Sequence, residues 1–145
     1  MKISIIHPSI NRPDQASETA KHWLSNMFSV LNLADYTLSL DTSDSTLNDY
    51  KENFVEGFNV IISDNHNVVE AANIGAKNCK GDILVLVSDD FECYPDWDID
   101  LINHYTENKN NVLKTNDGLQ GWIVTLPIMD REYYESCGYI YYPEY

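Results

Sequence analysis

The chain has 145 residues, a length that predicts a single domain with a genuine hydrophobic core. Nine Lys and Arg residues stand against 23 Asp and Glu residues, so the formal net charge is −14. A surface with this charge repels the phosphates of nucleic acids and anionic lipids, which disfavours both as non-specific partners. We also expect no signal peptide and no transmembrane segment, because no apolar stretch is long enough to cross a bilayer.

Three cysteines occur in the chain, at Cys79, Cys93 and Cys137. Their number is odd and none of them is part of a Cys-x-x-Cys spacing. This pattern indicates free thiols in a reducing compartment, not disulfides or a zinc site. We therefore expect a cytoplasmic location.

The first part of the chain predicts a strand, a loop and a long helix. Residues 2–7 are rich in β-branched side chains and predict a strand, and two prolines indicate a loop at 8–13. From Pro13 to Asn32, apolar residues recur three or four apart, which predicts a helix whose solvent face includes His22. The apolar stripe comprises Ala16, Ala20, Trp23, Leu24, Met27, Phe28 and Leu31.

Strands and helices continue to alternate along the rest of the chain. Gly75 lies inside a predicted helix, where glycine costs roughly 1 kcal/mol relative to alanine, and close packing would offset that cost. The alternation predicts an α/β sandwich with a mostly parallel sheet. The further expected strands are 36–40, 59–63, 83–87, a short one near 112–113, and 122–126; the further expected helices are 47–57, 68–80, 97–107 and 129–137.

Two adjacent carboxylates, Asp89 and Asp90, follow the most apolar of these strands. The uninterrupted run Ile83–Val87 is typical of a strand that is buried on both faces. Parallel α/β sheets bind ligands at the carboxyl ends of their strands, and two carboxylates there need a cation or a donor-rich ligand. The residues thus favour a metal–nucleotide site, and the alternative is a solvated acidic turn before the next helix.

Three other polar residues follow predicted strands, and each allows two interpretations. Arg12 could meet a phosphate or pair with the acidic surface. Asp41 could accept hydrogen bonds from a base or ribose, or it could form an Asx-turn or a helix cap. His66 could be a metal ligand, although a loop histidine is more often only solvated.

The order of these motifs resembles the family 2 glycosyltransferases of the GT-A fold. In that family a first strand leads to a Pro-Thr-x-Asn-Arg-like loop, and a second strand ends in an acidic turn. An Asn-x-Gly helix, a Gly-Asp pair, an apolar strand, an acidic DxD-type motif, an aromatic–Pro segment and an Arg-Glu-aromatic region follow. The corresponding segments here are 8–13, 40–44, 71–75, 81–82, 88–90, 94–97 and 127–138.

The resemblance implies a Rossmann-like GT-A domain over residues 1–145, with helices on both faces of the sheet. It implies transfer of a sugar from a nucleotide-diphospho-sugar donor to a saccharide or other acceptor, assisted by Mn²⁺ or Mg²⁺. Asp90 would coordinate the metal, and Asp89 would contact the ribose, the metal or a metal-bound water. The implied nucleotide-binding residues are Pro8, Ser9, Asn11, Arg12, Asp41, Asn73 and Asp89.

The chain also departs from the family pattern. Thr42 occupies the place of a second acid, and the acidic motif is Ser-Asp-Asp without the fuller Asp-x-Asp form. The family's catalytic base is expected in a segment beyond Tyr145, so the resemblance identifies no base here. We accordingly expect the acceptor-binding part to be missing.

The sequence also bears on three other classes of protein. A receiver-type phosphoacceptor needs its acidic pair after the first strand, where this chain has His7 and Pro8. A nucleotidyltransferase on a similar fold usually carries a glycine-rich basic loop there, and the loop at 8–13 has no glycine. A nucleotide-binding domain without turnover stays open as an alternative.

Overall fold

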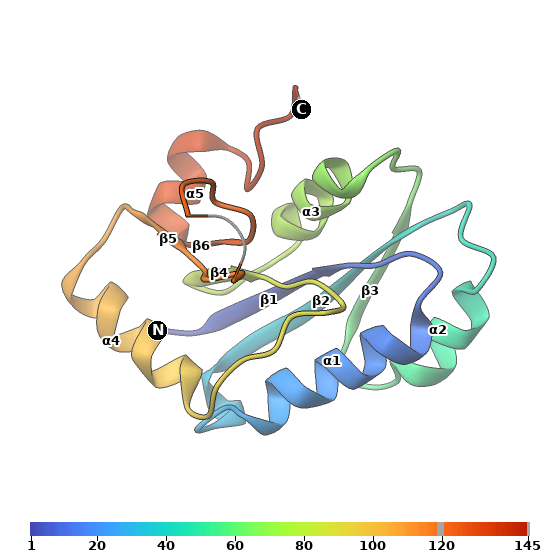
Figure 1. The fold of residues 1–145 in the computed structure, drawn as a ribbon, viewed down its shortest axis with the longest axis horizontal. Helices are drawn as coiled ribbons and strands as arrows, with labels where there is room; N and C mark the ends of the chain where they lie inside the picture. The colour runs from blue at the N-terminus through green and yellow to red at the C-terminus, as the bar shows by residue number, and fades with distance from the viewer. Residues whose placement is uncertain (119–120, 145) are drawn as a thin grey trace.

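The computed structural model describes residues 1–118 and 121–144, and within them six strands form one sheet with helices on both faces (Figure 1). The strands are β1 (Ile3–Pro8), β2 (Leu33–Asp41), β3 (Asn59–Ser63), β4 (Ile83–Leu86), β5 (Val112–Lys114) and β6 (Pro127–Asp130). The helices are α1 (Pro13–Ser25), the 3-10 turn η1 (Val30–Asn32), α2 (Leu47–Asn53), α3 (Val68–Lys77), α4 (Trp97–Glu107) and α5 (Arg131–Cys137).

The strand order is β3-β2-β1-β4-β6-β5. β1 pairs in parallel with β2 and β4, and β2 pairs in parallel with β3, whereas β6 is antiparallel to β4 and β5. The mostly parallel sheet expected from the sequence is confirmed. Because the first four strands point the same way, the loops that follow them meet at one edge.

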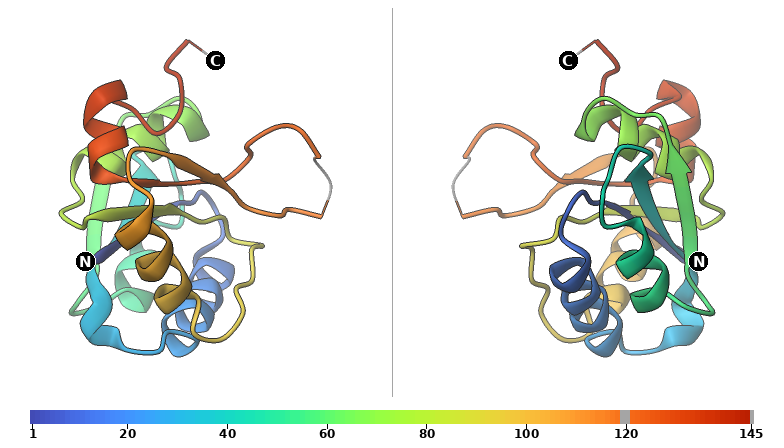
Figure 2. Two further views of the ribbon diagram at one scale, coloured as in Figure 1. Left: turned by 90° about the vertical axis from the view of Figure 1, so that its left-hand side faces the viewer. Right: turned by 90° about the vertical axis from the view of Figure 1, so that its right-hand side faces the viewer.

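Two apolar layers hold the helices on the sheet. α1, α2 and α4 cover one face, and α3 and α5 cover the other (Figure 2). β4 contributes Ile83 and Val85 to the first layer and Leu84 and Leu86 to the second, and all four are buried. The expectation that this strand is buried on both faces is therefore confirmed.

Gly75 explains how closely α3 approaches the sheet. A Cβ atom at this position would lie 2.8 Å from Cγ2 of Ile6 in β1. A β-branched core residue such as Ile6 has little freedom to move aside. The close packing expected around the mid-helix glycine is thus present.

The predicted helix over 13–32 is too long. α1 ends at Ser25, and Phe28 and Leu31 are 66% and 75% exposed instead of lying in the core. The buried carboxylate of Asp98 on α4 accepts hydrogen bonds from the backbone N–H groups of Phe28 and Ser29, at 2.7 and 3.3 Å. These bonds hold the chain in a turn where the apolar spacing alone predicted further helix.

The position of His22 also differs from the expectation. Its side chain is half-buried, with Nε2 3.1 Å from the carbonyl oxygen of Cys93, so it is not on a freely solvated face. Cys93 lies in the segment that follows the acidic turn, and that segment packs back against α1.

The prediction of a strand at 122–126 is wrong, because the strand lies in the segment that follows. β6 instead begins at Pro127, and Trp122 is 85% exposed. Figure 2 shows residues 121–126 within a segment that projects from the body of the molecule. Ile128 and Met129 are buried against β4, and proline is tolerated as the first residue of a strand because no ladder N–H is required there.

Two smaller findings complete the fold. All three cysteines are free thiols. Of the helices in the described part of the chain, none is both long and apolar enough to cross a membrane.

Candidate functional site

A cavity of about 910 Å³ opens at the carboxyl edge of the parallel strands. The segments at the ends of β1, β2, β3 and β4 line it through residues 8–12, 41 and 43, 64–68 and 88–89, and Ala71 of α3 completes the wall. The fold brings six of the sequence-predicted site residues to this cavity. They are Pro8, Ser9, Asn11, Arg12, Asp41 and Asp89.

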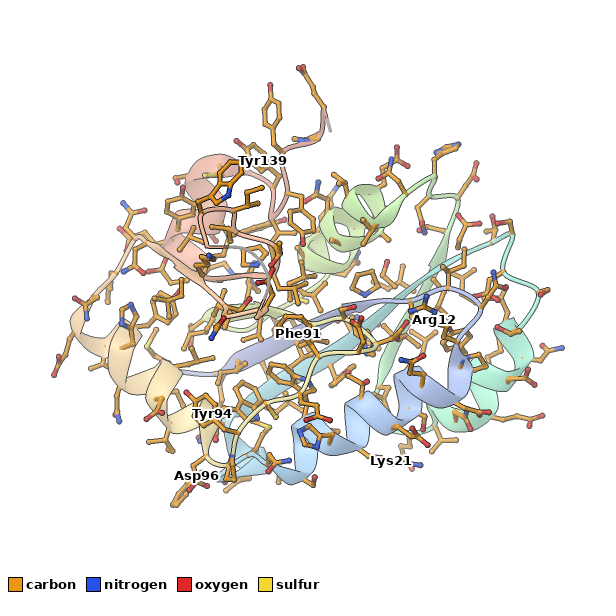
Figure 3. All side chains as sticks on the ribbon, in the orientation of Figure 1. Arg12, Lys21, Phe91, Tyr94, Asp96 and Tyr139 are labelled. Atoms are coloured by element: carbon orange, nitrogen blue, oxygen red, sulfur yellow. The ribbon has the colours of Figure 1, made fainter. Side chains whose placement is uncertain are left out.

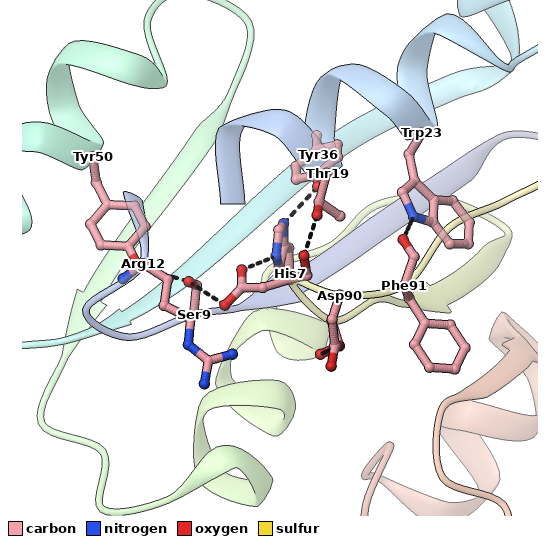
Figure 4. Close-up of polar contacts among 11 residues, drawn as sticks. His7, Ser9, Arg12, Thr19, Trp23, Tyr36, Tyr50, Asp90 and Phe91 are labelled. Atoms are coloured by element: carbon pink, nitrogen blue, oxygen red, sulfur yellow. Dashed lines mark hydrogen bonds and ion pairs between the residues drawn. The ribbon is translucent and has the colours of Figure 1, made fainter. Parts of the chain in front are cut away.

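Asp89 is 8% exposed and is held at three points, by His7, Ser9 and Thr19, which Figure 4 labels. Its Oδ1 lies 2.8 Å from Nε2 of His7, and its Oδ2 accepts a hydrogen bond of 3.0 Å from Oγ of Ser9. Its backbone carbonyl accepts a 2.5 Å hydrogen bond from Oγ1 of Thr19 on α1. Asp89 is therefore a fixed carboxylate, unlike a freely solvated turn residue.

Asp90 has a different environment from its neighbour. It is exposed, and its Oδ1 accepts a 2.7 Å hydrogen bond from Oγ of Ser88. It borders a second cavity of about 510 Å³, which lies against α1 and which Asp89 also lines. The second carboxylate of the pair thus lines the smaller cavity and not the larger one, and only Asp89 borders both.

Loop 8–12 is anchored by two side chains from the segment after β2. Asp44 accepts hydrogen bonds from the backbone N–H groups of Asn11 and Thr46, each at 2.7 Å. The hydroxyl of Tyr50 accepts one from the backbone N–H of Arg12 at 3.0 Å. The Arg12 side chain is exposed on this loop, whereas Lys21 projects from α1 (Figure 3).

Asp41 closes its own turn while it borders the cavity. Its carboxylate accepts hydrogen bonds from the hydroxyl and the backbone N–H of Ser43, the latter at 2.7 Å, and from the N–H of Asn65 at 2.9 Å. These bonds lower the pKa of Asp41 below its ordinary value, with the Ser43 hydroxyl as the main cause. The Asx-turn interpretation is present in the structure, together with a position suited to a ligand.

His66 lines the cavity from the loop after β3. Its Nδ1 is 3.0 Å from Oε2 of Glu70, and the same oxygen accepts a hydrogen bond from the His66 backbone N–H. The hydrogen bond to Glu70 raises the pKa of His66 above its ordinary value, and nearby acidic charges add to the rise. His66 is therefore a source of positive charge at the cavity when it is protonated.

Asn73 does not reach the cavity. Its side chain donates to the carbonyl oxygen of Tyr141 at 2.8 Å and accepts hydrogen bonds from the N–H groups of Ile140 and Tyr141, at 2.9 and 3.0 Å. In this structure Asn73 ties α3 to the C-terminal segment. The Asn-x-Gly motif resembled the family pattern, but the contacts of this asparagine are with the protein's own backbone.

The sequence did not predict three residues that support the cavity without lining it: His7, Tyr36 and Tyr50. His7 is completely buried and lies between Asp89 and the hydroxyl of Tyr36, while Tyr50 contacts Ser9. One signal could have identified His7. A histidine inside an otherwise apolar strand that is covered on both faces needs polar partners.

The donor chemistry of the acidic turn fits a divalent cation only in part. Within residues 1–118 and 121–144, no three His, Cys, Asp or Glu side chains lie close enough together to hold a metal ion by themselves. Mg²⁺ is often held by one or two carboxylates together with substrate phosphates. Asp90 suits that role because it is exposed and accepts one hydrogen bond, whereas both carboxylate oxygens of Asp89 already have protein partners.

This architecture defines the chain as an α/β protein of the GT-A type, with a polar cavity at the carboxyl edge of its sheet. The family model for glycosyl transferase family 2 matches residues 4–121, and the chain belongs to that family.

One curated relative and two solved structures illustrate the similarity. The chain is 23% identical over 144 residues to a glucosyl-dolichyl phosphate glucuronosyltransferase of Haloferax volcanii, which covers 95% of this chain and 45% of the relative. The fold of this chain is similar to that of S. aureus TarS 1–349 in complex with UDP. The TM-score is 0.74 at 17% identity, and the match covers 99% of this chain and 51% of that chain. It is also similar to the mannosyltransferase PcManGT from Pyrobaculum calidifontis in complex with GDP-Man and Mn²⁺, with a TM-score of 0.71, 12% identity, and coverage of 95% and 47%. The chain spans about half the length of these proteins.

Proposed function

We propose that this chain binds a nucleotide-diphospho-sugar in the cavity of about 910 Å³ and takes part in transfer of the sugar to a saccharide or other acceptor. The observation that carries the proposal is the joint placement of Asp89, Arg12 and Asp41 around one cavity, with Asp90 in the smaller cavity that Asp89 also lines. Family membership and the nucleotide complexes of similar proteins support it. The free thiols support a cytoplasmic location as part of the same proposal.

Each wall of the cavity has chemistry suited to one part of such a donor. An ionised carboxylate offers about four lone-pair sites, and Asp89 uses two of them for His7 and Ser9. The others are free to accept hydrogen bonds from ribose hydroxyls. Pro8, Ser9, Asn11 and Asp41 would surround the nucleoside, and the Arg12 guanidinium would approach the diphosphate.

Asp90 would hold Mn²⁺ or Mg²⁺ together with the oxygens of the bound diphosphate. The metal would supply positive charge that neutralises the leaving diphosphate. A chain with a net charge of −14 needs such a counter-charge in order to bind an anionic ligand. Asp89 would then serve as a fixed hydrogen-bond acceptor, or as the acceptor of a metal-bound water.

The test is isothermal calorimetry with UDP and GDP, each with and without Mn²⁺. We expect nucleotide and metal to bind with positive coupling, which is typically about 1–3 kcal/mol for linked sites. Asp90→Asn removes the proposed ligand at nearly constant volume and should abolish the coupling. Asp100→Asn is the matched control, because Asp100 is also exposed and also accepts one hydroxyl hydrogen bond, from Tyr94 at 3.1 Å.

Two results would contradict the proposal. The first is a nucleotide affinity that is indifferent to Mn²⁺ in the unmutated chain. The second is coupling that survives in Asp90→Asn, which would return the acidic pair to the role of a solvated turn. Binding without any sugar transfer to an acceptor would instead favour the second candidate, a nucleotide-binding domain without turnover.

A further inference from the structure

His7 is a completely buried histidine whose two ring nitrogens both have partners. Nδ1 lies 2.7 Å from the hydroxyl of Tyr36, and Nε2 lies 2.8 Å from Oδ1 of Asp89. Tyr36 is also completely buried, in β2, and it does not line the cavity. A buried polar chain thus runs from the interior of the sheet to the acidic turn (Figure 4).

The direction of each hydrogen bond follows from what each group can donate. An ionised carboxylate only accepts, so Nε2 of His7 donates to Asp89. In a neutral imidazole the other nitrogen is then an acceptor, and the Tyr36 hydroxyl donates to Nδ1. Burial raises the pKa of Tyr36 well above its ordinary value, and the charge of Asp89 adds to the rise, so Tyr36 keeps its proton.

The series of hydrogen bonds continues beyond Asp89 to the loop after β1. Ser9 has one hydroxyl hydrogen, which it donates to Oδ2 of Asp89. The hydroxyl of Tyr50, 2.7 Å from Oγ of Ser9, must therefore donate to Ser9, and it accepts from the N–H of Arg12. Every donor in this series of hydrogen bonds has an acceptor, which is the condition under which a buried polar network fixes one geometry.

The consequence is that both oxygens of Asp89 are fixed from opposite sides. One donor comes from within the sheet through His7, and the other comes from the nucleotide-facing loop through Ser9. With the backbone carbonyl held by Thr19, the carboxylate plane has no free rotation. A single donor would leave the unconstrained oxygen able to swing into or out of the cavity.

We propose that His7, held in one tautomer by Tyr36, is a positioning residue that fixes the Asp89 carboxylate for the hydroxyl groups of a bound nucleotide. The proposal rests on the proposed function, because it assumes that the cavity takes a nucleoside diphosphate. His7 contacts no ligand itself and acts only through Asp89.

The first test compares two buried tyrosines that each lose one hydroxyl. Tyr36→Phe leaves Nδ1 of His7 without its donor. Tyr105→Phe is the matched control, because Tyr105 is also completely buried and donates one 2.8 Å hydrogen bond, to the carbonyl oxygen of Ile128. In calorimetry with UDP and GDP in the presence of Mn²⁺, we expect Tyr36→Phe to weaken affinity about fivefold. The affinity of Tyr105→Phe should stay within about twofold of the unmutated value, because Tyr105 shares no partner with the hydrogen bonds around His7.

The second test uses rescue by shape at His7. The side-chain amide nitrogen of glutamine reaches the place of Nε2, whereas that of asparagine reaches only the place of Nδ1. His7→Asn should therefore weaken nucleotide binding roughly tenfold, while His7→Gln keeps most of the affinity. Thermal unfolding measures how much each of the two variants destabilises the fold. If His7 had a purely structural role, the two variants would differ in stability alone and not in nucleotide affinity.

A readout without ligand separates this proposal from the proposed function. The Phe91 N–H bonds across the turn to Ser88, and the Arg12 N–H bonds to Tyr50. Both amides should exchange with solvent several-fold faster in His7→Asn than in His7→Gln, because Asp89 no longer braces the turn and the loop. Equal exchange and equal affinity in the two variants would overturn the role of His7.

The remaining outcomes are also decisive. If the unmutated chain binds neither UDP nor GDP, the proposed function fails, and the exchange rates alone then decide whether His7 positions Asp89. Faster exchange together with unchanged nucleotide affinity would show a structural brace and overturn the positioning role. Equal effects of Tyr36→Phe and Tyr105→Phe on affinity would do the same.

Discussion

Asp41 shows how one residue can serve the fold and the cavity together. Its carboxylate accepts hydrogen bonds from the Ser43 hydroxyl and from two backbone N–H groups, and these bonds lower its pKa. A lowered folded-state pKa means that the stabilisation is present above the unfolded value of about 3.9 and is lost as pH falls through the folded value. Substitution of Asp41 would therefore change the turn as well as any ligand contact, which makes Arg12 the cleaner probe of nucleotide binding.

Arg12→Ala should weaken the binding of UDP or GDP and leave the fold intact. The side chain is exposed beside the cavity, and the contact that anchors the loop is made by the Arg12 backbone, which alanine retains. We expect the change in unfolding free energy to stay within about ±0.5 kcal/mol, as for ordinary surface positions. Calorimetry and thermal unfolding measure the two effects, with Lys21→Ala on the exposed side of α1 as the control. Equal affinity in the two variants would place Arg12 outside the nucleotide site.

His66 should make nucleotide binding depend on pH. Its pKa is raised by Glu70, so the protonated form persists above the ordinary value of about 6.5 and is lost as pH rises further. Since a nucleoside diphosphate is anionic, affinity should fall as pH rises through that raised value. Affinity is measured across the range from about pH 5 to 8, where histidine titrates.

The same measurement on His66→Gln removes the ligand's own titration from the comparison. The variant should show a flatter pH profile than the unmutated chain. His104→Gln on α4, which is away from the cavity and contacts Asn111, serves as the control histidine. If the pH profiles of affinity for the unmutated chain and His66→Gln superimpose, the charge of His66 does not contribute to nucleotide binding.

At the scale of elements, α3 joins three parts of the molecule. Its first turn lies at the cavity, where Asn67 caps the helix by accepting a 2.9 Å hydrogen bond from the N–H of Glu70. Its last turn packs against β1 through Gly75, and Asn73 binds the C-terminal segment. The positive end of the helix dipole therefore faces the cavity, which adds support for an anionic ligand there.

Asn73→Ala should release the C-terminal segment without affecting nucleotide binding. The substitution removes three hydrogen bonds to the backbone of residues 140–141. We expect faster proteolytic cleavage within residues 139–142 and a loss of about 1–3 kcal/mol in unfolding free energy. Asn78→Ala is the control, because its side chain bonds only to its own helix, at the carbonyl oxygen of Ile74. A marked loss of UDP or GDP affinity in Asn73→Ala would instead support the nucleotide contact expected from the sequence.

At the scale of the whole molecule, charge determines how an anionic ligand can be bound. The chain carries a net charge of −14, so a free nucleoside diphosphate approaches against a repulsive field. A divalent cation reduces this repulsion at the place where the carboxylates concentrate it. Metal and nucleotide should therefore stabilise the folded chain together more than separately.

Thermal unfolding measures this joint stabilisation. A ligand at a hundredfold excess over its Kd adds about 2.7 kcal/mol to the stability of the folded state. For a chain of this size that corresponds to a rise in Tm of roughly 5–10 °C. We expect the rise with UDP or GDP plus Mn²⁺ to exceed the sum of the separate effects, and the excess to vanish in Asp90→Asn. Simple additivity in the unmutated chain would argue against a shared site.

The sequence by itself determined the architecture and the edge of the sheet at which the candidate site lies. Alternating apolar periodicities identified the strands and helices of the parallel part, because burial on a sheet face or a helix stripe repeats at a fixed local spacing. It also placed Asp89 and Asp90 after a fully buried strand. Since parallel strands end at one edge, it followed that the loops after them would meet there.

Only the tertiary structure decided the partners. Asp98 on α4 ends the helical region that the apolar stripe extended to Leu31, and pairing with β4 selects Pro127–Asp130 as a strand instead of the apolar run before it. His7 meets Tyr36 and Asp89 across 29 and 82 positions of sequence. A local pattern records how exposed a residue is, whereas the identity of a hydrogen-bonding partner depends on which distant segments the fold brings within about 3 Å.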